Sequence, residues 1–195
     1  MRILSGKLKG SKILSNNSKV EGSERFITRP TSDRVKETLF NIIRHGFNID
    51  FMNASFFDSF SGSGAVGLEA ISRGASKVSF LDKDRAACEC IKKNMDNFRL
   101  HENDKSKSFR VFNYDFFDKN FSPNEKFDVI FMDPPYELVN SGEVFIRLEE
   151  LRVTKINSLI IYESNRKLEK ADGLQIQKSR KIGKTYLNFF KVENK

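Results

Sequence analysis

The chain has 195 residues, a length that suits one domain with a sizeable core. Its 38% hydrophobic and 31% charged residues are typical of a globular protein. No apolar run approaches the ~18–20 residues of a membrane span, and the N-terminus lacks the apolar stretch of a signal peptide. We therefore expect a cytoplasmic protein with one domain over residues 1–195, in which residues 1–28 extend a core at 29–195.

The net charge of +8 is unevenly distributed along the sequence. Residues 1–44 carry ten Lys/Arg and four Asp/Glu, residues 165–195 carry nine and three, and residues 45–164 carry fifteen and nineteen. The local balances are therefore +6, +6 and −4. Basic ends around an acidic centre suit a protein that holds a polyanion at its flanks and a small ligand in its middle. Solvated surface lysines would give the same totals, so charge alone leaves both interpretations open.

The predicted elements become regular after an irregular start. Residues 2–4 and 11–14 predict a small hairpin, residues 15–28 a loop, and residues 30–33 the start of a helix that runs to 45 or 46. Strands are then predicted at 54–58, 77–81, 109–113, 127–132 and 158–162, helices at 65–72, 85–98 and 144–151, and a last pair of strands at 174–182 and 185–191. This order predicts an α/β protein with a doubly wound, mostly parallel sheet, helices on both faces and an antiparallel C-terminal hairpin at one edge.

The first chemical motif is a glycine-rich loop between a strand and a helix, with Gly62, Gly64 and Gly67 in the pattern Gly-x-Gly-x-x-Gly. Such glycines let the backbone approach a ligand closely, and a nicotinamide dinucleotide is the obvious competitor for this pattern. Asp58 at the end of the preceding strand would repel a pyrophosphate and attract the ammonium of a methionyl group. Asp82 ends the next strand, where it can accept hydrogen bonds from ribose hydroxyls in either class of cofactor.

The second motif, Asp133-Pro134-Pro135-Tyr136, follows an apolar strand, at the point where ligand chemistry occurs in an open parallel sheet. The Asp133 carboxylate and the Pro134 carbonyl can each accept a hydrogen from a nucleobase amino group, so that the nitrogen lone pair faces a methyl donor. The prolines rigidify the loop, and Tyr136 offers a flat face for base stacking. A plain turn would use the same residues, but the glycine loop upstream favours methyl transfer from S-adenosylmethionine without a metal.

A weaker motif follows the strand at 109–113. Asp115 could bind the adenine amino group of the cofactor, and Phe116 could pack on its ring. A solvated turn acid beside core phenylalanines fits the same residues equally well. Cys88 and Cys90 lie two apart in a predicted helix and therefore face different ways, which favours ordinary core or surface positions over a metal site.

Over nearly its whole length the chain resembles the bacterial 16S ribosomal RNA guanine-N2 methyltransferases of the RsmD type. The resemblance rests on residues 2–10, the glycine loop, the loop from Asp133 to Tyr136 and residues 162–164, and most specifically on residues 29–41. It implies a seven-stranded class I methyltransferase fold with an added N-terminal hairpin. It also implies methylation of one guanine of small-subunit rRNA at N2, within a partly assembled particle, and we expect a monomer.

The resemblance also assigns roles by position. Asp58, Gly62 and Gly64 would hold the methionyl part of the cofactor, Asp82 the ribose and Asp115 the adenine, with Ser59 and Phe116 completing the set, and Asp133, Pro134, Pro135 and Tyr136 would hold the target base. The expected RNA contacts are Arg2, Lys7, Lys9, Arg29, Arg34 and Lys36. The last three stand at the front of a helix, where the dipole disfavours cations unless a phosphate meets them. Pairing of Arg34 and Lys36 with Asp33 and Glu37 explains these cations about as well.

Three alternative functions are compatible with the same sequence features. An adenine-N6 methyltransferase acting on DNA or RNA could use the same acceptor loop. A dinucleotide-dependent oxidoreductase could use the same glycines, and an RNA-binding assembly factor could keep the charge pattern without any activity.

Overall fold

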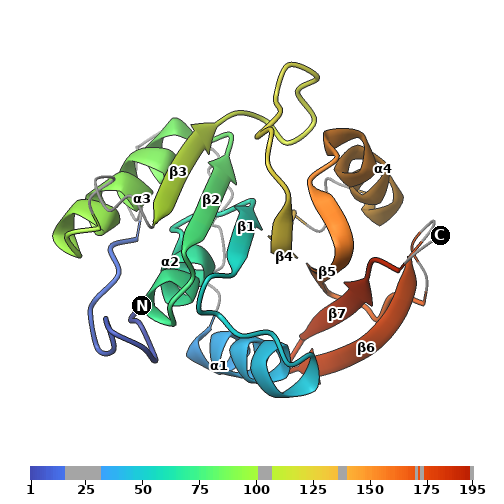
Figure 1. Ribbon diagram of the computed structural model, residues 1–195, viewed down its shortest axis with the longest axis horizontal. Helices are drawn as coiled ribbons and strands as arrows, with labels where there is room; N and C mark the ends of the chain where they lie inside the picture. Colours follow the sequence, from blue (N-terminus) through green and yellow to red (C-terminus); the bar gives the residue numbers. More distant parts are fainter. Residues whose placement is uncertain (16–31, 101–106, 136–139, 170, 172–173, 194–195) are drawn as a thin grey trace.

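The computed structural model describes residues 1–15, 32–100, 107–135, 140–169, 171 and 174–193. Its elements are α1 (Asp33–Asn41), η1 (Ile42–Gly46), β1 (Ser55–Ser59), α2 (Ala65–Ser72), β2 (Lys77–Asp82), α3 (Arg85–Asn97), β3 (Ser108–Asn113), β4 (Phe127–Met132), α4 (Ser141–Leu151), β5 (Thr154–Ser164), β6 (Gln175–Ile182) and β7 (Thr185–Lys191). Figure 1 shows them arranged around one twisted sheet. None of the helices in these ranges is long and apolar enough to cross a membrane.

The sheet has seven strands in the order β3-β2-β1-β4-β5-β7-β6. The first five run parallel, β7 is antiparallel to β5, and β6 is antiparallel to β7. The strand order turns back between β1 and β4, which places a topological switch point, the usual location of a ligand site, at the carboxyl ends of these two strands. The predicted doubly wound, mostly parallel sheet with an antiparallel C-terminal hairpin is confirmed.

Two apolar cores cover the two faces of the sheet. The first core joins α1, α2 and α3 to one face, and the second joins α4 and the 116–121 segment to the other. Strands with helices on both faces must be apolar on both sides, which explains the nearly continuous apolar run of β4, four of whose six residues are buried hydrophobics in succession. The sequence Val-Ile-Phe-Met therefore alternates between the two cores.

The element boundaries follow from local chemistry, with two corrections to the prediction. Ser32 caps α1 by accepting a hydrogen bond from the Val35 amide at 3.3 Å. The helix was expected to run on to residue 45 or 46, but α1 ends at Asn41 and the chain continues as the π-helix η1. Strand β5 begins at Thr154 instead of 158, with Asn157 at a φ of +69° near its start.

The N-terminal segment forms less of a hairpin than predicted. Its two runs pair through a single bridge, Arg2 to Lys12, and not through a ladder of paired strands. Buried polar side chains of α2 anchor the segment instead. Glu69 accepts hydrogen bonds from the Leu4 and Ser5 amides at 2.7 and 3.0 Å, and Ser72 accepts one from the Leu8 amide. These side chains replace the strand partners that a hairpin would have supplied.

Candidate active site

Three carboxylates gather at the carboxyl ends of β1, β2 and β4. The sheet register pairs Ser59 with Leu81 of β2 on one side and with Met132 of β4 on the other. Asp58, Asp82 and Asp133 therefore lie at the ends of three adjacent strands, as their positions in the sequence predicted. All three carboxylates come from residues 45–164, the acidic middle part of the sequence.

Asp58 is the most buried member of the cluster, with 2% of its surface exposed. Its Oδ2 accepts a hydrogen bond from the Gly67 amide, in the first turn of α2, at 2.8 Å. Burial raises the pKa of Asp58 well above its usual range, the Gly67 amide opposes this, and the nearby carboxylates of Asp133 and Asp82 raise it further. A cation brought to this point would relieve the repulsion, so the cluster favours a positively charged ligand.

Asp82 connects the second strand to the glycine loop. Its Oδ2 accepts a hydrogen bond from the Gly62 amide and its Oδ1 one from the Asp84 amide, both at 2.8 Å. Burial raises the pKa of Asp82 despite these two donors. Asp82 therefore shapes the loop in addition to the expected role of binding ribose hydroxyls, which stays a prediction.

The three glycines of the loop serve different needs. Gly62 has a φ of +54°, and a Cβ added there would meet nothing within 4 Å, so its backbone faces open space where a ligand can approach. A Cβ at Gly64 would lie 2.9 Å from Ile91 Cγ1, and one at Gly67 would lie 2.2 Å from Phe80 Cε1. The last two glycines therefore allow α2 to pack closely, while the first leaves room for a ligand.

Side chains in the strand and turn before Gly62 fix the loop. Ser61 Oγ donates to the Asp58 carbonyl at 2.5 Å and accepts from the Leu81 amide at 3.0 Å, which ties the loop to β1 and β2. Phe60 adopts a φ of +65°, an uncommon value for a non-glycine residue. The Ser59 side chain, expected to contact the cofactor, is fully buried and donates to the Phe131 carbonyl at 3.0 Å. It therefore joins β1 to β4 and offers no hydroxyl to a ligand.

The acceptor loop begins where β4 ends. Asp133 is half-buried, Pro134 is buried and Pro135 is exposed, while Tyr136 lies outside the described residues. Met132 pairs with Tyr162 of β5, so Tyr162 lies on the strand next to the start of the loop, with its ring stacked on Phe145. Burial raises the pKa of Tyr162 to about 12, the Asp133 carboxylate contributes in the same direction, and Arg166 opposes both. The Tyr162 hydroxyl therefore stays protonated at neutral pH.

The turn after β3 differs from the prediction in one residue. Asp115 is exposed, accepts a hydrogen bond from the Phe117 amide at 2.9 Å and lies 3.8 Å from the Lys83 ammonium. Phe116, expected to pack on the adenine ring, is only 2% exposed and packs against Phe60 and Phe117. Its ring belongs to the second core, and the exposed rings at this turn are those of Tyr114 and Phe117.

Arg147 of α4 holds this turn, a role that the sequence analysis missed. Its guanidinium is nearly buried and donates to the carbonyls of Phe116 at 3.0 Å, Asp118 at 2.6 Å and Phe121 at 3.2 Å. One signal was available in the sequence, because Arg147 stands three residues after Val144 and four before Leu151, on the apolar face of α4. A cation on an apolar helix face must find buried acceptors.

The expected RNA contacts separate into different environments. The Lys36 side chain has no exposed surface, and its ammonium donates to the Arg2 carbonyl at 2.6 Å and lies 3.4 Å from Asp33 Oδ1. Lys36 is therefore a structural cation, and its assignment to RNA was wrong. Arg2, Lys7, Lys9 and Arg34 are exposed, and Arg29 lies outside the described residues. The Lys7 amide bonds the Ser72 carbonyl, at the end of α2 far from the glycine loop.

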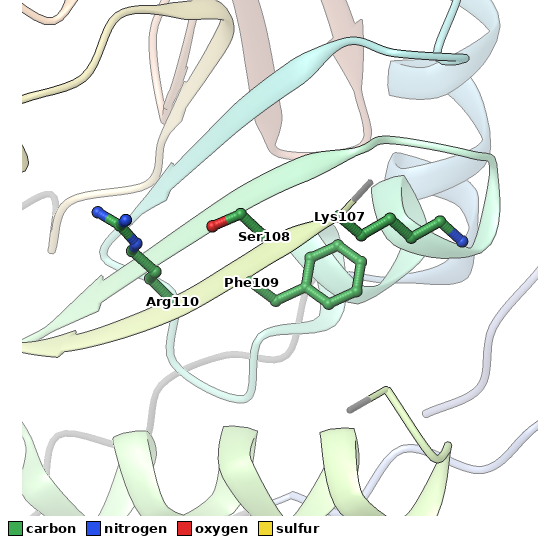
Figure 2. Close-up of a pocket in the computed structure, with 4 residues that line it drawn as sticks. All are labelled: Lys107, Ser108, Phe109 and Arg110. Atoms are coloured by element: carbon green, nitrogen blue, oxygen red, sulfur yellow. The ribbon is translucent and has the colours of Figure 1, made fainter. Parts of the chain in front are cut away.

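A surface depression lies elsewhere on the molecule. Lys107, Ser108, Phe109 and Arg110 line it, on the edge strand β3 (Figure 2). These four residues are consecutive in sequence and begin at the amino end of the strand, whereas the carboxylate cluster lies at the carboxyl ends. The depression is therefore separate from the candidate active site.

Comparison with known proteins places this geometry in a family. A family model described as conserved hypothetical protein 95 matches residues 1–191. Ribosomal RNA small subunit methyltransferase D of Haemophilus influenzae is 35% identical over 168 residues, which cover 85% of this chain and 79% of that protein. The protein of the same name from Escherichia coli K12 is 31% identical over 164 residues, which cover 84% and 74%.

Solved structures agree with the fold. A candidate methyltransferase of Escherichia coli superposes with a TM-score of 0.78 at 26% identity, covering 100% of this chain and 99% of that one. An RNA methyltransferase of Salinibacter ruber, solved with S-adenosyl-L-homocysteine, has a TM-score of 0.62 at 11% identity over 86% and 95% of the two chains, a likeness of fold alone. The sheet is thus that of class I methyltransferases, and the chain belongs to the conserved hypothetical protein 95 family, which is the family of the ribosomal RNA small subunit methyltransferase D proteins.

Proposed function

We propose that this protein transfers a methyl group from S-adenosylmethionine to the exocyclic N2 amino group of a guanine in small-subunit rRNA. The names of the relatives support an rRNA substrate and a methyl transfer. The choice of guanine N2, and of a partly assembled small-subunit particle as the substrate, rests on the family resemblance, above all at residues 29–41.

The carboxylate cluster is the observation that carries the choice of cofactor. S-adenosylmethionine has a cationic sulfonium and a cationic amino group, and a buried Asp58 beside Asp82 and Asp133 favours such a ligand. A dinucleotide would bring a pyrophosphate to the same carboxylates and would be repelled. The open side of Gly62 gives the methionyl part a backbone surface to approach.

The chain's own residues supply position and charge to the reaction. Asp133 and the Pro134 carbonyl accept the two hydrogens of the amino group and orient the nitrogen lone pair toward the methyl carbon. The nitrogen–carbon bond forms as the sulfur–carbon bond breaks, and the proton leaves the amino nitrogen afterwards. When bound, the cofactor supplies the electrophilic methyl group, so no covalent intermediate with the protein is needed.

Methylation of purified rRNA and of small-subunit particles with a labelled donor, followed by digestion to nucleosides, tests the proposal. Label is expected in N2-methylguanosine. Asp133→Ala should lower the rate at saturating cofactor by about a hundredfold or more, because the amino group loses one of its two acceptors, while RNA binding persists. Label in N6-methyladenosine would overturn the substrate, and tight NADH binding without any response to S-adenosylhomocysteine would overturn the class of enzyme.

A further inference from the structure

The carboxyl edge of the sheet is divided into two halves of opposite charge. Over β1, β2, β3 and β4, acids stand at or close to the strand ends, namely Asp58, Asp82, Asp115 and Asp133, with Lys83 beside Asp115. Beyond β4, on the side of β5, β7 and β6, the exposed basic residues at the same edge include Arg166, Lys181 and Lys184, while Glu163 near the end of β5 is buried. The acceptor loop lies at the boundary between the halves.

The sheet register places these basic residues in one row. Ser164, the last residue of β5, pairs with Tyr186 of β7, and Tyr186 pairs with Lys181 of β6. Because β6 runs in the same direction as β5, its end and the turn that carries Lys184 lie at the carboxyl edge. The Lys181 ammonium lies 5.4 Å from the centre of the Tyr186 ring, which keeps this cation at the edge.

Arg166 connects the row to the acceptor loop. Ser164 Oγ donates to the Arg166 carbonyl at 2.5 Å, so the chain turns immediately after β5. The guanidinium lies near enough to Tyr162 to affect its titration, and Tyr162 also feels Asp133. With strands about 4.8 Å apart, three strand spacings place β6 about 14 Å from the acceptor loop, which a few nucleotides can span.

Basic residues outnumber acidic ones in the part of the sequence that forms this row. Residues 174–192 contain five Lys/Arg and no Asp/Glu. Glu193 stands at the other end of β6, where it accepts a hydrogen bond from Gln177 at 3.3 Å. An anion that follows the turn between β6 and β7 would therefore meet mainly cations.

We propose that Arg166, Lys181 and Lys184, with the Tyr186 ring beneath Lys181, form the surface that holds the RNA backbone on one side of the target base. The inference rests on the proposed function, because it takes RNA as the substrate. The acidic half then holds the cationic cofactor, the basic half holds phosphates, and the target base enters at the boundary, beside Asp133. The RNA strand therefore approaches the acceptor loop from the side of β5, β7 and β6.

The test compares two triple variants of the full chain. Arg166→Ala, Lys181→Ala and Lys184→Ala together remove the basic row. Lys77→Ala, Lys107→Ala and Lys126→Ala together remove three cations from the amino ends of β2, β3 and β4, on the opposite edge. Binding of purified rRNA is measured over a range of salt, alongside the thermal midpoint and the affinity for S-adenosylhomocysteine of each variant.

The basic-row variant should bind rRNA about tenfold more weakly at low salt, and the slope of log affinity against log salt should fall by about 2, since each phosphate contact on a single strand contributes about 0.7. Its affinity for S-adenosylhomocysteine and its thermal midpoint should stay at wild-type values, and the amino-edge variant should match the wild type throughout. An unchanged slope would overturn the surface, and a loss seen only with ribonucleoprotein particles would assign it to an acidic protein instead. Methyl transfer by the wild-type protein is measured separately, so failure of the proposed function can be distinguished from failure of this RNA-binding surface.

Discussion

Lys36 has a different role in the structure from the one that its position in the sequence predicted. In the sequence it is one of several cations at the start of a helix, whereas in the structure its ammonium is enclosed between the Arg2 carbonyl and Asp33. A buried ammonium is tolerated only with such partners, because desolvation disfavours an isolated charge. The residue therefore fastens the N-terminal segment to α1 and is not available to a ligand.

Lys36→Met tests this role, because methionine keeps much of the stem and removes the charge. The free energy of unfolding in urea should fall by about 3 kcal/mol, since the Arg2 carbonyl and Asp33 lose their buried partner. Arg34→Met, at an exposed position on the same helix, should change stability by no more than about 0.5 kcal/mol. A Lys36→Met protein with wild-type stability and weakened RNA binding would restore the original assignment.

At the scale of elements, α4 and the turn after β3 act together. Three backbone carbonyls of the turn depend on Arg147, and the turn carries Asp115, the residue expected to bind the cofactor adenine. A helix on one face of the sheet thus sets the geometry of a loop at its edge. The contact is a positioning contact, since Arg147 points into the second core and not toward open space.

Arg147→Met should weaken S-adenosylhomocysteine binding about tenfold, equivalent to about 1.4 kcal/mol, because the turn loses its fixed shape. The rate at saturating cofactor should change little, so the effect separates binding from chemistry. Glu150→Gln is the matched control, since it removes only the ion pair of Arg147 with a mostly exposed partner. Calorimetric titration measures all three proteins, and equal affinities would show that the turn holds its shape without Arg147.

The sequence specified most elements because each has a strong local signal. The strand at 127–132 and the helix at 65–72 were predicted with their exact bounds, since an apolar run and a glycine-bounded pattern mark their ends. The π-helix η1 was missed because its residues keep the apolar spacing of an ordinary helix. The early start of β5 was missed because Ile156 is exposed and Asn157 interrupts the regular backbone.

The candidate site was predictable to a different degree for each kind of residue. Asp58, Asp82 and Asp133 end parallel strands, and strand ends meet at one edge, so their convergence followed from the order of elements alone. Ser59 and Phe116 lie beside them in sequence, but burial depends on contacts with distant segments. The sequence pattern predicted that both residues contact the cofactor. In the structure both side chains are buried in the protein interior.

At the scale of the whole molecule, the carboxylate cluster links stability to pH. The folded-state pKa values of Asp58 and Asp82 are raised, so these two carboxyls hold more protons in the folded protein than in the unfolded chain above about pH 4. Their contribution to the stability of the free protein should therefore fall as pH rises from 3.8, the ordinary pKa of an Asp carboxyl, through the raised pKa values. Affinity for a cationic ligand should rise over the same range, because the carboxylates become charged.

Asp58→Asn should flatten this pH dependence and raise the thermal midpoint of the free protein at neutral pH, by about 2–4 °C for each 1 kcal/mol of removed desolvation cost. It should also weaken S-adenosylmethionine binding about tenfold or more. Asp128→Asn should act oppositely on stability, because burial of Asp128 is outweighed by its bonds to Lys155 and Ser55, which lower its pKa. Thermal scans between pH 4 and 8 compare the two, and a lower midpoint for Asp58→Asn at neutral pH would refute the destabilising role of that charge.

The hydrogen bonds that anchor residues 1–15 also determine when this segment can fold during synthesis. The Leu4 amide binds Glu69, 65 residues later, and the Leu14 amide binds Asn94, 80 residues later. This segment leaves the ribosome before either partner exists, so it must wait in solvent until α2 and α3 have been made. These residues are translated before their partners and yet dock only after α2 and α3 have been made, so their docking requires that both helices have formed.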